Sequence, residues 1–141
     1  GKSGADGAGR PRQVVRGGTM ALEQPASKMQ VGLPITADIQ TLPLGLQIDN
    51  GFGQGKTKNV NKAWLRVHRS SGIFAGPSFD RLTEVKQRTI ENYGSPPALK
   101  TEEVSVSVAP SWGADGAVCI RQLDPLPLNI LSIALEVAIG G

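Results

Sequence analysis

The residues with the clearest potential for chemistry lie in the glycine-rich stretch Gly51–Thr57, which reads GFGQGKT. A loop that binds nucleotide phosphates has the pattern G-x-x-x-x-G-K-[ST] and leads into a helix. The end of the stretch matches this pattern, but Asn50 occupies the position of the first glycine. No helical pattern follows Thr57, so no helix N-terminus is expected to bind an anion there. We interpret the stretch as a loop between strands and expect no cofactor.

The only histidine, His68, and the only cysteine, Cys119, are the remaining candidates for nucleophilic catalysis. A Cys-His arrangement would need both residues together, yet they fall in two different predicted strands, with His68 on an outward face. Neither has Cys or His neighbours at a metal-ligand spacing. The carboxylates that we considered for acid-base or calcium chemistry show no suitable spacing: Asp80, Glu84, Glu102, Glu103, Asp115 and Asp124. The sequence therefore predicts no catalytic or metal site and no enzyme.

Composition indicates one domain that is rich in strands and turns. The chain has 141 residues, with 18 glycines and 10 prolines, and only 4% of its residues are aromatic. This length suits a single core, and frequent glycine and proline favour turns over long helices. The net charge of +3 is mild and spread along the chain, unlike the dense basic patch of a nucleic-acid binder. No apolar run reaches the ~20 residues of a membrane-spanning helix, so we expect no membrane anchor.

Apolar residues alternate with polar ones in several segments, which is typical of half-buried strands. The clearest are residues 60–68, 104–108 and 130–139, and residues 117–122 are predicted to form the return strand after 104–108. Six to eight mostly antiparallel strands without a helical period predict an all-β fold, either a β-sandwich or an open barrel. We expect a flexible linker over residues 1–10 and the β domain over residues 11–141.

The other segments carry more specific expectations. Val31–Ile48 alternates with a change of phase, which predicts a long strand that bends near residues 40–43. Gly17-Gly18 predicts a turn after which Thr19–Leu22 pairs back on Pro11–Arg16 as a hairpin. Leu82–Thr89 fits a strand or a helical turn, and the strands around it favour a strand. Ser70–Pro77 reads as a loop, whose tip would expose Ile73 and Phe74.

Aromatic and apolar residues at exposed positions suggest an interface rather than a pocket. Trp64 faces away from the apolar side of its predicted strand, so it belongs to a second packed layer or to an interface. An exposed apolar loop tip favours contact with a partner. The candidate interface residues are Trp64, Ile73, Phe74 and Trp112.

Three segments together resemble the C-terminal part of the tail nozzle (tail tubular protein B-like) proteins of short-tailed bacteriophages. They are LEQPASKMQVGLPITADIQTLPL at 22–44, GFGQGKTKNVNKAWLRVHRSSGIFAGP at 51–77, and VCIRQLDPLPLNILSIALEVAIGG at 118–141. Nozzle proteins are several times longer, so the resemblance implies that this chain is the last part of a longer polypeptide.

The resemblance implies a structural role in the virion tail, with synthesis in the host cytoplasm. Nozzle proteins form a homo-oligomeric, usually hexameric ring below the portal and adaptor, and tail fibres or spikes attach near it. DNA is ejected through the ring, which implies passage without specific binding. The alternative from the residues is a receptor- or glycan-binding β-sandwich of a fibre or spike, for which Trp112 close to Asp115 is the one aromatic-acidic cluster.

Overall fold

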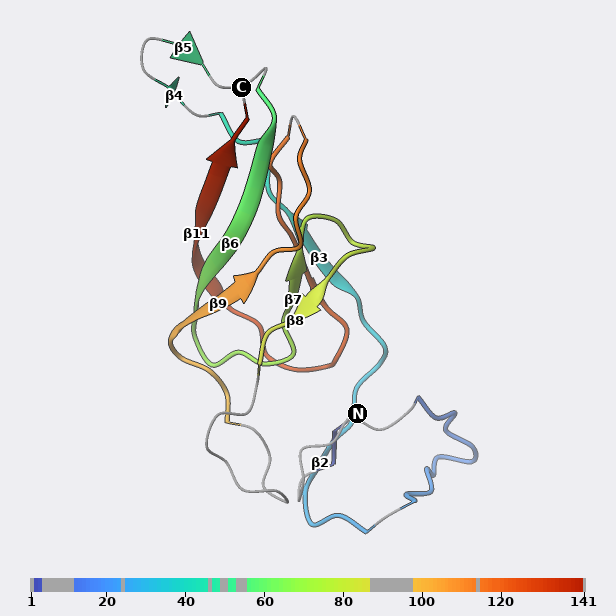
Figure 1. The fold of residues 1–141 in the computed structure, drawn as a ribbon. Helices are drawn as coiled ribbons and strands as arrows, with labels where there is room; N and C mark the ends of the chain where they lie inside the picture. Colours follow the sequence, from blue (N-terminus) through green and yellow to red (C-terminus); the bar gives the residue numbers. More distant parts are fainter. Residues whose placement is uncertain are drawn as a thin grey trace.

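The chain folds into two antiparallel β-sheets that pack face to face (Figure 1), in a computed structural model. The structure describes residues 2–3, 12–23, 25–45, 47–48, 51–52, 56–86, 98–113 and 115–140. Within them the strands are β1 (Lys2–Ser3), β2 (Met29–Gln30), β3 (Ala37–Gln40), β4 (Gln47–Ile48), β5 (Gly51–Phe52), β6 (Lys58–Val67), β7 (Phe74–Gly76), β8 (Thr83–Glu84), β9 (Glu103–Ser107), β10 (Cys119–Gln122) and β11 (Ile130–Ile139). No helix occurs among these residues. The predicted all-β class is confirmed.

The two main sheets differ in strand number. One has four strands in the order β3-β10-β7-β8, and the other has three in the order β11-β6-β9. Since β8 contacts β9, these two edges lie together, and β3 and β11 form the other edges. The sheets do not close into a barrel, so the sandwich is the correct member of the predicted pair. Two short pairs, β1-β2 and β4-β5, lie outside the sandwich.

The central strand β6 supplies much of the core, as its alternation predicts. Ala63, Leu65 and Val67 are each at most 1% exposed, and the side chains between them face outward or are only partly buried. The valines of β9 at 104 and 106 pack into the same cluster. Burying a side chain of the size of leucine stabilises a fold by about 1.5–3 kcal/mol, so this strand contributes a large part of the stability.

A buried polar network joins the loops at one end of the sandwich. The backbone N–H of Asn129 donates to Ser70 Oγ at 2.8 Å. The side-chain Nε2 of Gln122 donates to the carbonyl oxygen of Ser71 at 2.8 Å. Because an unpaired buried polar group is costly, these bonds are needed once the loops are covered. Among the described residues, every buried side-chain nitrogen and oxygen atom has a partner.

The segment Val31–Ile48 differs most from its prediction. Only Ala37–Gln40 forms a strand of a main sheet, as β3, and Gln47–Ile48 forms the short β4. Residues 31–36 have the alternation of a strand but pair with no other strand among the described residues. Alternation of apolar and polar residues shows that a segment is suited to a sheet. The segment forms a strand only where another strand lies beside it to accept and donate backbone hydrogen bonds.

The predicted loop Ser70–Pro77 contains a short strand, and its apolar tip is not exposed. Phe74–Gly76 is β7, which pairs with both β10 and β8. Ile73 is 1% exposed and belongs to the core cluster. The expectation of an exposed tip is therefore wrong for Ile73, because pairing of the following residues draws this segment into the four-stranded sheet.

The two glycines predicted to form a turn near the N-terminus do so. Gly17 and Gly18 have φ values of 57° and 74°, which glycine adopts without steric cost. They join Arg16 and Thr19, which form an isolated antiparallel bridge. The predicted turn at Gly17-Gly18 is confirmed, while the hairpin is limited to this one bridge. Of Leu82–Thr89, β8 covers Thr83–Glu84, and residues 87–89 lie outside the described part, as do residues 1 and 4–10 of the expected linker.

Candidate assembly surfaces

The sequence-derived interface residues occupy separate places on the sandwich. Trp64 is partly buried on the outer face of β6, with Lys62 Nζ 5.4 Å from its ring centroid. Phe74 is partly buried in β7 of the opposite sheet, and Ile73 beside it lies in the core. Trp112 is 57% exposed and close to Gly140, beyond the end of β11. The structure does not gather these residues into one site.

The residues considered for catalysis also remain apart. The strand β6 begins directly after Thr57, where a phosphate loop would need a helix. His68 is exposed at the end of β6, whereas Cys119 is buried in β10 of the other sheet. Burial raises the pKa of the Cys119 thiol, and the nearby Asp38 raises it further, so this thiol is protonated at neutral pH and is a poor nucleophile.

The described residues contain no group of three or more His, Cys, Asp or Glu side chains placed to hold a metal ion. They also contain no helix that is long and apolar enough to cross a membrane.

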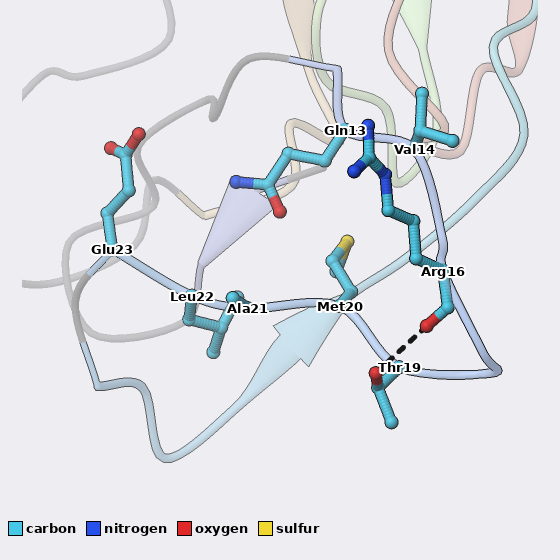
Figure 2. Close-up of a pocket in the computed structure, with 8 residues that line it drawn as sticks. All are labelled: Gln13, Val14, Arg16, Thr19, Met20, Ala21, Leu22 and Glu23. Carbon is cyan, nitrogen blue, oxygen red and sulfur yellow. Dashed lines mark hydrogen bonds between the residues drawn. The ribbon is translucent and has the colours of Figure 1, made fainter.

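The concavity in Figure 2 is a bend of the chain rather than a cleft between packed layers. Its lining residues all come from one stretch, 13–23, and all but Met20 are exposed. Thr19 Oγ1 donates to the carbonyl oxygen of Arg16 at 3.0 Å and holds the bend. A ligand pocket normally encloses its ligand between several elements, so this bend has the character of a surface segment.

That bend belongs to a longer segment, residues 12–23 and 25–36, which we call the N-terminal arm. In Figure 1 the arm runs away from the sandwich before it enters β3. Apart from Met20, its large apolar side chains are exposed to solvent: Val14, Val15, Leu22, Met29, Val31, Leu33 and Ile35. Scattered apolar residues are common on surfaces, but a run of this length is typical of a surface that contacts another protein.

The arm contacts the loop between β10 and β11 of its own sandwich. Gln30 Nε2 donates to the carbonyl oxygen of Pro125, and Gly32 lies so close to the Pro125 ring that a larger residue would overlap it. Val31 and Leu33 on either side remain exposed, with Leu33 82% exposed. The glycine therefore lies against the chain's own loop while its apolar neighbours face solvent.

The second unusual surface is the outer edge of β11. This strand pairs only with β6 among the described residues, so one edge of its ten residues is open. Its core-facing side chains, Ile133, Leu135 and Val137, are only partly buried, although the facing residues of β6 are fully buried. A long apolar edge strand offers unpaired backbone groups to another chain.

Sequence reasoning missed both surfaces, although their residues were in view. The alternation of Val31, Leu33 and Ile35 and that of β11 both predict segments suited to a sheet, but only β11 forms a strand. Neither pattern says whether a neighbouring strand is present.

Comparison with known proteins adds no family: the sequence matches no protein-family model and no curated protein. The arm and the open edge of β11 are thus the features of this chain from which a function can be argued.

Proposed function

We propose that this chain is a structural component of the tail of a short-tailed bacteriophage, in the ring that forms the tail nozzle. In this role it assembles with further copies of itself into a ring, which is hexameric by the resemblance stated above. The ring contacts portal and adaptor proteins and tail fibres or spikes, and DNA passes through it without specific binding. The protein is then located in the virion and carries no catalytic activity.

The observation that carries this proposal is the run of exposed apolar residues on the arm. An isolated domain gains nothing from holding seven large apolar side chains in water, because burial of such groups is the main favourable term in folding and association. A ring subunit covers such residues with a neighbour. The mild net charge of +3 also suits a subunit that DNA passes without being retained.

The experiment is assembly with the neighbouring parts of the tail. The purified chain, alone and mixed with portal-adaptor complexes, would be imaged by negative-stain electron microscopy and sized by analytical ultracentrifugation. We expect ring-shaped oligomers, and we expect the chain to be present in purified virions. Monomers throughout, together with absence of the chain from virions, would overturn the proposal.

A second candidate rests on Trp112, which is 57% exposed, with the exposed Asp115 three residues further along the chain. An exposed indole close to a carboxylate suits stacking and hydrogen bonding to a sugar ring. This favours a receptor- or glycan-binding domain of a fibre or spike. A glycan array distinguishes the two functions: binding that is lost in Trp112→Ala supports this candidate, and an array without hits removes it.

A further inference from the structure

We propose that residues 31–36 of one copy add as an antiparallel strand to the open edge of β11 in a neighbouring copy. The inference rests on the proposed assembly function and names the contact that would build the oligomer. It joins the two surfaces described above, since the arm carries the unpaired strand-like segment and β11 carries the unpaired edge.

The first support is the difference in strand number between the two sheets. Among the described residues, the sheet that contains β11 has three strands, and the sheet it packs on has four. The β8 and β9 edges meet, so the missing strand is on the β11 side. One added strand would give four strands facing four and would cover the partly buried side chains Ile133, Leu135 and Val137.

The second support is the direction of the backbone groups in β11. The backbone N–H of Val67 donates to the carbonyl oxygen of Glu102, next to β9, so the backbone groups of Val67 face β9. The backbone groups of the preceding residue, Arg66, therefore face the opposite side, toward β11. There Arg66 lies opposite Ser132, so the backbone groups of Ser132 face β6. Because direction alternates along a strand, Ile133 and Leu135 direct their N–H and C=O groups to the open edge. The same two residues have side chains that pack on the core.

The third support is the position of the proline in the arm. Val31, Leu33 and Ile35 occupy alternate positions, so in a strand their backbone groups share one edge and their side chains share one face. Pro34 belongs to the other edge, and it has no N–H to donate. The segment can therefore bond through its apolar residues, while Pro34 faces outward, as proline does in edge strands.

The direction of the backbone groups in β11 and in residues 31–36 favours an antiparallel over a parallel arrangement of the two strands. In an antiparallel pair, opposite residues that bond to each other have side chains on the same face. The side chains of Val31, Leu33 and Ile35 would thus lie on the core face, because these residues would be opposite the bonding residues of β11. A parallel strand bonding through the same residues would place them on the outer face, in water.

Cross-linking between chains tests the geometry. In the antiparallel pair, Thr36 lies on the outer face opposite Ser132 or Ala134, depending on register. A Thr36→Cys chain would be mixed with a Ser132→Cys or Ala134→Cys chain that carries a tag of different size, and a mild thiol oxidant would be added. We expect a disulfide-linked pair of unequal chains. Ser105→Cys, exposed on the outer face of β9, is the matched control and should form no such pair with Thr36→Cys.

Association strength tests the contribution of the arm. Leu33 and Leu42 are similarly exposed, at 82% and 84%, but only Leu33 lies in the donated segment. We expect Leu33→Asp to raise the dissociation constant of self-association about tenfold or more, with Leu42→Asp close to the unaltered chain. Analytical ultracentrifugation over a concentration series measures both.

The outcomes separate this inference from the proposed function. Rings that form without the Thr36 cross-links, with equal effects of the two leucine variants, would overturn strand addition and leave the nozzle function standing. A disulfide between two Ala134→Cys chains, with no effect of Leu33→Asp, would mean that β11 pairs with itself and would also overturn it. Failure of the unaltered chain to assemble, even with portal-adaptor complexes, would overturn both.

Discussion

At the scale of single residues, Gly76 is a position where backbone leaves no room for a side chain. A Cβ atom added there would overlap the carbonyl oxygen of Arg81, which is backbone and has little freedom to move. We expect Gly76→Ala to lower the free energy of unfolding by about 1–3 kcal/mol, the usual cost of overpacking. Urea unfolding followed by tryptophan fluorescence measures it. Gly113→Ala is the matched control, because a Cβ at Gly113 meets open space; an equal loss in both variants would contradict the steric explanation.

A second residue-scale prediction concerns the ion pair between Asp38 of β3 and Arg121 of β10. The guanidinium donates to both carboxylate oxygens, at 2.7 and 2.8 Å. The hydrogen bonds from Arg121 hold the pKa of Asp38 below its ordinary value of 3.8. A carboxyl with a lowered pKa in the folded state contributes stability that is complete above its ordinary pKa and is lost as the pH falls through the folded value.

We therefore expect Asp38→Asn to destabilise the fold at neutral pH and to match the unaltered chain at low pH. Unfolding free energies at a series of pH values between neutral and strongly acidic would show the two curves converging. In an Arg121→Gln background the substitution should have little effect, because the partner is gone. A destabilisation that persists unchanged at low pH would mean that Asp38 acts through something other than its charge.

At the scale of elements, β6 is the strand on which the sandwich depends. It pairs with β11 on one side and β9 on the other, and Leu65 at its centre is fully buried. We expect Leu65→Ala to cost about 2–5 kcal/mol, since it removes a large core side chain and leaves a cavity. Leu42→Ala, at an exposed position, should change stability by no more than about 0.5 kcal/mol. Thermal or urea unfolding distinguishes them, and similar effects would contradict this assignment of the core.

The same elements show what alternation alone can predict. The strands β6, β9 and β11 follow from the period of two in their apolar residues, because each has one face toward the core. The strand β7 does not, since Phe74–Gly76 is only three residues long, contains a glycine and is followed by a proline. It forms because two neighbouring strands pair with it, and that pairing buries Ile73. Tertiary contacts of this kind leave no local signal.

The surfaces proposed for assembly are even harder to predict from local sequence patterns. Trp112 is an interface candidate by residue type and Trp64 also by its position on the outer face of a strand, and the role of both in an interface stays a prediction. The open edge of β11 depends on sheet order, which arises from contacts between segments far apart in the chain. Its ten-residue apolar pattern would look the same in a central strand, where both edges are paired.

At the scale of the whole molecule, the arm and the β11 edge are different surfaces of one chain. A contact in which one copy donates and the next accepts is heterologous, so it continues from copy to copy until a ring closes or a filament grows. Pairing of β11 with β11 would instead be isologous and would stop at two copies. The strand-addition geometry thus agrees with a ring, and self-pairing does not.

This difference leads to a prediction for mixtures. A Leu33→Asp chain has a damaged donor segment, but its β11 edge is unchanged, so it can accept an arm without passing one on. Added in small proportion to the unaltered chain, it should interrupt rings and yield shorter open assemblies. Ultracentrifugation or mass photometry would show the ring population falling more steeply than the fraction of variant added, because one defective copy disrupts every ring that contains it. A Leu42→Asp chain in the same proportion should leave the rings intact, and a fall merely proportional to dilution would contradict donor-to-acceptor assembly.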